Sequence, residues 1–181
     1  MEAADRERED RAGSRHAAGN AAGEPAAPPE LVIACLRAHP RAVLPERMTA
    51  GASGFDLHAC LDEPLVLAPG RWAAVPTGLV LEIPPGYEGM VRARSGLAAR
   101  HGIGVLNGPG TIDSDYRGEV KVLLMNWGEE PFRLEPGDRV AQIVFAAVPP
   151  VRVAWAESLG ETVRGSGGFG HTGARPPGGR E

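Results

Sequence analysis

The chain has 181 residues, with 19 Lys and Arg against 23 Asp and Glu and a formal net charge of -4. This length suits one domain with a sizeable core, with or without tails. The acidic balance excludes a general attraction to nucleic acid or anionic lipid, so any phosphate must be bound by a few placed groups. No stretch approaches the ~20 consecutive apolar residues of a membrane span, and the first residues carry no secretory pattern. We therefore expect a cytoplasmic protein that does not bind membranes.

The two ends of the chain differ in composition from its middle. Residues 1–29 alternate charged side chains with Ala, Gly and Pro and have no repeating apolar face. We expect a disordered extension there, because these residues cannot bury enough surface to offset the entropy lost on ordering. Residues 157–181 are similar in composition and are expected to form a flexible arm. The folded domain is then residues 30–156, with Cys35 and Cys60 as buried, reduced thiols in strand-like stretches.

Between the two ends, short apolar runs alternate with turn signals such as Pro-Gly and Asn-Gly. The clearest runs are residues 31–36, 65–67, 72–75, 79–83, 120–125 and 140–148. Strands at roughly 8–12-residue spacing predict an all-β sandwich, barrel or jelly roll. One short helix is predicted over residues 95–101, with Ser95 as its N-cap and Gly102 at its end. There is no βαβ alternation, so a doubly wound fold is not expected.

The start of the predicted helix carries a candidate phosphate site. Arg94, Ser95 and Gly96 would direct a guanidinium, a hydroxyl and free backbone N–H groups toward one point, which suits a phosphate oxygen. Taken alone, a Ser N-cap beside a solvated Arg is the commoner explanation. Asp56 and Gln142 lie in strand-like stretches. Asp56 could be a site residue or a buried acid bonded to backbone, and Gln142 could face a ligand or the solvent.

The stretch from residue 110 to residue 118 contains two acids. If it is extended, Asp113 and Asp115 face the same side, because strand side chains alternate. They could then bind a metal, or one could activate water as a general base. The alternative is an Asp- and Gly-rich turn in which Arg117 pairs with a carboxylate.

Asn107 and Gly108, just upstream, are typical of a hairpin tip between residues 103–105 and Ile112. A rigid hairpin of this kind could read the edge of a nucleobase through its main-chain donors and acceptors. The alternative is an ordinary connection between two strands.

The Gly-rich segment near the C-terminus has the spacing G-x-G-x-x-G at Gly165, Gly167 and Gly170. A dinucleotide-binding loop is rejected, because no strong strand leads into the segment and no crossover helix follows it. A Gly-rich segment with an Arg and an aromatic ring can instead fold over a nucleotide, with backbone N–H groups on the phosphates. The alternative is a flexible linker, which does not account for Arg164 and Phe169.

Taken in order, these stretches resemble the five motifs of the trimeric dUTPase family. The resemblance covers residues 31–173 and is most specific at residues 94–97, 112–118 and 164–170. It implies an all-β, jelly-roll-like barrel with one short helix, assembled as a homotrimer with active sites at the subunit junctions. It also implies Mg²⁺-assisted hydrolysis of dUTP to dUMP and pyrophosphate. That reaction limits uracil incorporation into DNA and supplies dUMP for dTMP synthesis.

The resemblance assigns roles to individual residues. Asp113 matches the acid that activates the attacking water, and Tyr116 matches the ring that packs on the deoxyribose. Asn107 and Thr111 fall in the part that binds the uracil nucleoside. Phosphate contacts are implied for Arg94, Ser95, Gly96 and Gln142. Asp56 matches the acid of the first motif, which is associated with Mg²⁺ through water.

The resemblance also assigns a role to the C-terminal arm, which would close over the active site. Arg164, His171 and Thr172 would meet the terminal phosphate. Phe169, followed by Gly170, would cover the uracil.

Three other functions are compatible with parts of this pattern. A dCTP deaminase shares the broad fold, but the intact arm and the segment around Asp113 favour hydrolysis. A non-catalytic trimer that binds dUTP or a partner protein is a different class, and the presence of the base argues against it. A nucleic-acid-binding barrel is disfavoured by the acidic charge and the few aromatic residues, so no stable nucleic-acid binding is expected.

Overall fold

The computed structural model describes residues 30–168 of the chain. By its internal contacts the chain divides into residues 1–32 and residues 33–181, and the fold described below is that of the second unit. Among the described residues, no helix is long and apolar enough to cross a membrane.

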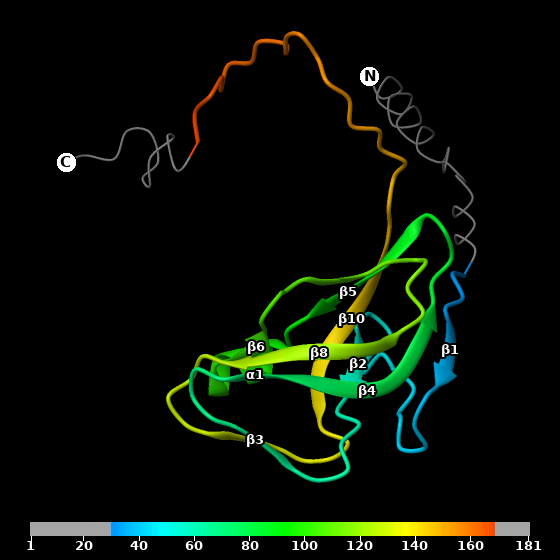
Figure 1. Ribbon diagram of the computed structural model, residues 1–181, viewed down its shortest axis with the longest axis vertical. Coiled ribbons are helices and arrows are strands. Elements are labelled where there is room, and N and C mark those ends of the chain that lie inside the picture. Colours follow the sequence, from blue (N-terminus) through cyan, green and yellow to red (C-terminus); the bar gives the residue numbers. More distant parts are fainter. Residues whose placement is uncertain (1–29, 169–181) are drawn as a thin grey trace, which may run out of the picture. The chain divides into compact units, whose positions relative to one another are not determined.

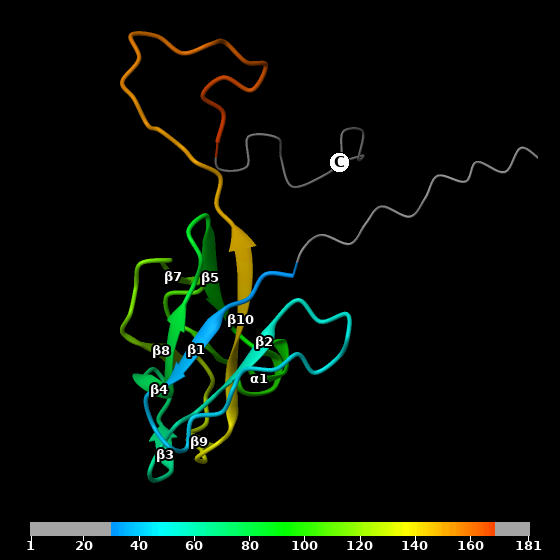
Figure 2. The same ribbon diagram turned by 90° about the vertical axis from the view of Figure 1, so that its right-hand side faces the viewer.

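The described part of this unit contains ten strands and one short helix (Figures 1 and 2). The elements in chain order are β1 (Ala34–Arg37), β2 (Phe55–His58), β3 (Leu65–Leu67), β4 (Trp72–Glu82), β5 (Tyr87–Arg92), α1 (Ser95–His101), β6 (Ile103–Val105), β7 (Gly110–Ile112), β8 (Glu119–Asn126), β9 (Phe132–Leu134) and β10 (Arg139–Ala147).

The strands form two four-stranded antiparallel sheets and one two-stranded sheet. The first sheet has the order β1-β4-β8-β6, the second has the order β2-β10-β5-β7, and β3 pairs with β9. Figures 1 and 2 show the strands β1, β4 and β8 lying against β10 and β5 of the other sheet. The core is aliphatic and includes the fully buried residues Leu57, Val75, Val122, Leu124 and Ile143. The prediction of an all-β fold with one short helix is confirmed.

The predicted strand positions agree with the structure, with differences at the ends. Residues 65–67 are β3, and residues 120–125 lie inside β8. The prediction for residues 31–36 is shifted, because the backbone that pairs with β4 is Ala34–Arg37. Two strands, β5 and β9, were not predicted, since each mixes apolar and charged residues within a short, half-exposed segment.

The prediction of separate strands at residues 72–75 and 79–83 is wrong, because β4 is one continuous strand. Pro76 lacks an N–H donor, and Gly78 has a φ of +67°, so the sequence between the two runs resembles a break. The structure absorbs both residues in an irregularity of the strand. The register of β4 against β8 shifts between Pro76 and Val80.

The predicted hairpin between residues 103–105 and Ile112 is also wrong. β6 pairs with β8 in one sheet, whereas β7 pairs with β5 in the other. Residues 106–109 therefore form a connection that crosses between the sheets. The N–H of Leu106 anchors it by donating to the carbonyl of Leu123 at 2.8 Å.

Helix α1 has the predicted bounds but a different N-cap. Arg94 is the N-cap, with φ -86° and ψ 123°, and it makes no side-chain cap hydrogen bond within the described chain. Ser95 is the first helical residue, so its assignment as N-cap is wrong by one position. Gly102 ends the helix as predicted, in the left-handed conformation, and its N–H donates to the carbonyls of Ala98 and Leu97.

Both cysteines are free thiols, as predicted. Cys35 and Cys60 were expected to be buried and are each partly buried, and Cys60 follows β2 without belonging to a strand. Burial raises the pKa of both thiols. The Sγ atom of Cys60 lies 3.1 Å from Nδ1 of His39.

Candidate active site

Asp56 is the centre of a charged group that we call the arginine cluster, which consists of Asp56, Arg94, Arg139 and Gln142. β2 and β10 pair so that Asp56 lies opposite Gln142. One oxygen of this buried carboxylate lies 3.0 Å from Nη1 of Arg139, and the other lies 3.5 Å from Nε of Arg94. Nη1 of Arg94 also donates to the carbonyl of Arg139 at 2.9 Å. One carboxylate between two guanidinium groups leaves net positive charge, which suits an anionic ligand.

Arg139 was not predicted as a site residue. In a regular strand, Arg139 and Gln142 would face opposite sides of the sheet, because they are three positions apart. The register of β10 against β2 shifts between Arg139 and Ala141, and this irregularity brings both side chains to the region of Asp56. The sequence does place a basic residue, Arg139, close to the candidate Gln142. The alternation of side chains along a strand, however, predicts that the two residues face opposite sides of the sheet.

The arginine cluster continues into the start of α1. Nε2 of Gln142 donates to the carbonyl of Ala93 at 3.0 Å, directly before the helix N-cap. The backbone N–H groups of Ser95 and Gly96 find no acceptor among the described residues. The guanidinium of Arg94 and the free N–H groups therefore belong to the segment to which Gln142 is bonded, and the exposed Ser95 lies in the same segment.

His58 lies beside the arginine cluster, two positions after Asp56 on the same strand. Its Nδ1 atom is buried and has no hydrogen-bond partner in the described part of the chain. Burial is the main cause of a lowered pKa of His58, and Arg139 and Arg94 lower it further, while Asp56 acts in the opposite direction. The imidazole is therefore neutral at neutral pH and adds no charge to the cluster.

Residues 113–118 form a second candidate group, which we call the acidic turn. Of the two alternatives for Asp113 and Asp115, the structure has the turn and not the extended strand, because β7 ends at Ile112 and the chain then turns toward β8 in the other sheet. The N–H of Tyr116 donates to the carbonyl of Asp113 at 3.2 Å. Both acids are exposed, and neither forms an ion pair with the described residues.

The ring of Tyr116 lies directly over Gly118, where a β-carbon would fall within 3 Å of the ring. Its hydroxyl donates to the carbonyl of Glu119 at 3.1 Å. The residue is 44% exposed, so part of its ring is accessible to a ligand. Asn107 on the connection and Thr111 on β7 are also exposed, on the chain segment that leads into the acidic turn.

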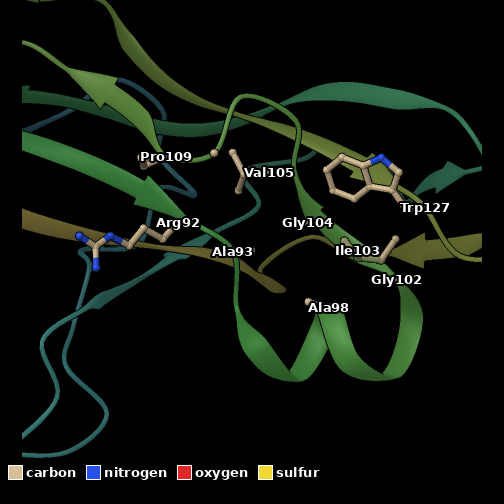
Figure 3. A pocket seen from close by; sticks show the side chains of 10 residues that line it. Arg92, Ala93, Ala98, Gly102, Ile103, Gly104, Val105, Pro109 and Trp127 are labelled. Carbon is tan, nitrogen blue, oxygen red and sulfur yellow. The ribbon is translucent and has the colours of Figure 1, made fainter. Parts of the chain in front are cut away.

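A pocket of about 700 Å³ lies between α1, β6 and the connection of residues 106–109 (Figure 3). Its lining residues are Arg92, Ala93, Ala98, Gly102, Ile103, Gly104, Val105, Gly108, Pro109 and Trp127. Figure 3 shows Arg92 and Trp127 on opposite sides of it. None of the predicted site residues lines this pocket, although it borders the segments that carry Arg94 and Asn107.

The arm is described as far as residue 168. Residues 148–166 are exposed and contain no strand. Nε of Arg164 donates to the carbonyl of Gly167 at 2.8 Å, which closes a local turn. The predictions for Phe169, Gly170, His171 and Thr172 lie outside the described residues.

The structure thus brings together Asp56, Arg94, Gln142 and the start of α1, and separately it brings together Asp113 and Tyr116. Within residues 30–168, no hydrogen bond or ion pair connects the arginine cluster to the acidic turn. The same residues contain no group of three or more His, Cys, Asp or Glu that could hold a metal ion.

Comparisons with known proteins match this arrangement to one family. The family model for dUTPase matches residues 41–173. The deoxyuridine 5'-triphosphate nucleotidohydrolase of Chlamydia pneumoniae is 59% identical over 132 residues, which cover 72% of this chain and 91% of that protein. The chain belongs to the dUTPase family. It is accordingly an enzyme of the dUTP diphosphatase class, a hydrolase of nucleotide metabolism.

Other relatives extend the match. The protein of the same name from Syntrophotalea carbinolica is 51% identical over 143 residues, 79% of this chain and 97% of that protein. Solved structures have the same fold at lower identity. The dUTPase of Staphylococcus bacteriophage 80alpha with dUPNHPP has a TM-score of 0.71 at 24% identity, covering 78% of this chain and 98% of that one. A mutant dUTPase of phage phi11 of S. aureus, described with a structural Mg(II) ion, has a TM-score of 0.64 at 22% identity and covers 70% of this chain and 97% of that one.

Proposed function

We propose that this protein hydrolyses dUTP to dUMP and pyrophosphate, with water attacking the α-phosphate. The observation that carries the proposal is the arginine cluster. It offers two guanidinium groups, one buried carboxylate and the free N–H groups of α1 in a chain matched to the dUTPase family over residues 41–173. The exposed acid and ring of the acidic turn supply the remaining chemistry.

The arginine cluster is suited to the phosphates. Arg94, Ser95 and Gly96 present a guanidinium, a hydroxyl and backbone N–H groups, while Gln142 fixes the backbone beside them. Hydrolysis between the α- and β-phosphates builds negative charge on the leaving pyrophosphate. Donors that are already held in place stabilise that charge without reorganisation during the reaction.

The metal is expected to be Mg²⁺ bound mainly by the substrate. Asp56 already faces Arg139 at 3.0 Å and Arg94 at 3.5 Å, so direct ligation by its carboxylate would compete with both arginines. An indirect contact through water fits this environment, because Mg²⁺ keeps waters and takes phosphate oxygens. When bound, the ion would neutralise phosphate charge.

The acidic turn is suited to the water and the sugar. Asp113 accepts a proton from the attacking water as its oxygen bonds to the α-phosphorus and the bond to the pyrophosphate breaks. Tyr116 packs on the deoxyribose, so that a 2'-hydroxyl would clash. Asn107 and Thr111 contact the uracil nucleoside. Thymine differs from uracil by one methyl group, and attractive contacts alone discriminate such a difference by only about 1–3 kcal/mol. Rejection of thymine therefore relies on a clash with the connection of residues 106–109.

We further propose a homotrimer whose active sites are shared between subunits. Two observations support it. Among residues 30–168 no hydrogen bond or ion pair connects the arginine cluster to the acidic turn, and the segment after β10 exposes Val151, Val153 and Trp155 at alternate positions. Alternating apolar residues are typical of a strand that packs on a partner surface. In this proposal residues 30–156 are the catalytic domain, and residues 157–181 close over the site, with Arg164, Phe169, Gly170, His171 and Thr172 on the nucleotide.

The proposal is tested by measuring pyrophosphate release with Mg²⁺ from dUTP, dTTP, dCTP and UTP side by side. Release from dUTP far above the other three supports both the reaction and the base and sugar selectivity. Release of ammonia from dCTP, or no pyrophosphate from dUTP with a folded protein, would contradict it.

A further inference from the structure

Arg117 follows the candidate sugar-stacking ring directly and points back into the acidic turn. Its Nη1 atom donates to the carbonyl of Ser114 at 2.7 Å and to the carbonyl of Tyr116 at 2.9 Å. Nη1 carries two hydrogens, so these bonds use both of them. Its Nη2 atom lies 3.7 Å from Oε1 of Glu82 at the end of β4. The guanidinium therefore bridges two carbonyls of the turn and is held toward the body of the domain.

Apart from the bonds of Arg117 and the bond from the Tyr116 hydroxyl to the carbonyl of Glu119, the acidic turn has few restraints among the described residues. Its backbone contributes the bond from Tyr116 to the carbonyl of Asp113, which at 3.2 Å is at the long end of the usual range. Asp113, Asp115 and Tyr116 are all exposed, so burial of apolar surface contributes little to fixing the turn. The turn also leaves one sheet and enters the other, so neither sheet's hydrogen-bond ladder extends through it.

We propose that Arg117 is a positioning residue for Asp113 and Tyr116, an inference that rests on the proposed dUTP hydrolysis. By donating to the carbonyls of both Ser114 and Tyr116, its guanidinium fixes the loop between the general base and the sugar-stacking ring. The bonds involve a charged donor, which makes them stronger than the backbone bond they supplement. Both hydrogens of its Nη1 atom are directed at the turn and Nη2 faces Glu82, so the guanidinium is oriented toward the protein backbone.

The test compares Arg117→Met, Arg117→Gln and Arg117→Lys with the wild-type protein in steady-state pyrophosphate release from dUTP. Misplacement of a reacting group by about 1 Å can cost about 10²-fold in rate. We expect Met and Gln to lower kcat by about 10- to 100-fold with KM changed by less than about 3-fold. Lys keeps three N–H donors and is expected to recover most of kcat. The thermal unfolding midpoint should be unchanged, because the side chain is half exposed.

Arg133→Met is the matched control. Arg133 on β9 is also exposed and pairs with a carboxylate, that of Glu135, so its loss removes the same charge far from the turn in sequence. Unchanged kcat in Arg117→Met and Arg117→Gln would overturn the inference, as would a rise in KM without a fall in kcat, or a Lys variant no better than Met. Wild-type protein without dUTP hydrolysis would instead overturn the proposed function.

Discussion

At the scale of single residues, the two acids Asp56 and Asp113 of the candidate site differ in burial and in ion pairing. Asp56 is buried and is stabilised by the guanidinium groups of Arg94 and Arg139. Asp113 is exposed and forms no ion pair with the described residues. A buried, paired carboxylate suits an architectural role, whereas an exposed and unpaired one is free to accept a proton.

Replacing Asp113 with Asn is expected to lower kcat by about 10²–10⁴-fold, because the amide cannot accept the proton of the attacking water. Binding of dUTP should stay close to that of the wild type, since the phosphate contacts belong to the arginine cluster. Calorimetric titration with dUTP and measurement of pyrophosphate release separate the two effects. Asp115→Asn, two positions away and equally exposed, is the matched control and should turn over normally. An Asp113→Asn protein with normal turnover would refute the assignment of the base.

His58 predicts a pH dependence of stability. Burial lowers its pKa from the ordinary value of 6.5, so the unfolded chain binds a proton on this residue more readily than the folded protein does. Its contribution to stability is therefore complete above pH 6.5 and is lost as the pH falls toward the folded pKa. Urea unfolding without Mg²⁺ or nucleotide, between about pH 7.5 and about pH 5.5, should show a smaller loss in His58→Gln than in the wild type. Equal losses in the two proteins would contradict this account.

At this scale, the sequence predicted most of the residues that the structure brings together. Arg94, Gln142 and Asp56 are candidates from three different motifs, and the structure places them together. Arg139 could not be predicted, because strand alternation assigns it to the opposite face and only the irregularity in β10 reverses this. The role of Arg117 also depends on a turn geometry that the pattern of Asp and Gly residues does not specify.

At the scale of elements, α1 links the fold to the site. Gly102 ends it with a φ of +64°, and a β-carbon there would lie 2.5 Å from the backbone nitrogen of Gly128. The end of the helix is therefore packed tightly against the segment that follows β8. This contact fixes the direction of α1 and, with it, the position of the N–H groups at its start.

Replacing Gly102 with Ala is expected to destabilise the protein more than replacing Gly86. Gly86 has a φ of +86° with open space around the missing β-carbon, so Ala there should cost about 1–2 kcal/mol from the left-handed backbone alone. Gly102→Ala adds a clash with backbone atoms, which should cost about 1–3 kcal/mol more. The free energies of unfolding in urea measure the difference. Equal values for the two variants would mean that the close contact at Gly102 relaxes without cost.

Element boundaries were predicted well where one pattern dominates. The Gly at the end of α1 and the apolar run of β8 each have one strong local signal. The continuity of β4 was missed, because Pro76 and Gly78 are usually breakers and the pairing with β8 overrides them. The hairpin at Asn107 was predicted wrongly, because Asn-Gly indicates a local turn, whereas the sheet that each flanking strand joins is decided by pairing with distant strands.

At the scale of the whole molecule, the amino-acid pattern predicted an all-β fold but not the strand order, which depends on pairings between segments far apart in sequence. The catalytic assembly requires still more than one chain in our proposal. In that proposal, partner subunits cover the exposed Trp155 after β10 and complete the site around the acidic turn, which no hydrogen bond or ion pair within residues 30–168 connects to the arginine cluster.

Deleting residues 164–181 is expected to reduce turnover of dUTP by on the order of 10²-fold without unfolding the domain, because the deletion removes the groups that we propose to close the site. Deleting only residues 174–181 keeps the Gly-rich segment and should leave turnover unchanged. Steady-state assays and circular dichroism of both truncated proteins make the comparison. A folded protein that lacks residues 164–181 and retains full activity would rule out a role for the arm.

The most direct test of the central claim is a single turnover of dUTP in ¹⁸O-labelled water, with mass spectrometry of both products. Attack of an Asp113-activated water on the α-phosphate predicts one ¹⁸O atom in dUMP and none in pyrophosphate. Label in pyrophosphate would mean attack at the β-phosphate, and the absence of dUMP would mean that the chain does not catalyse this reaction.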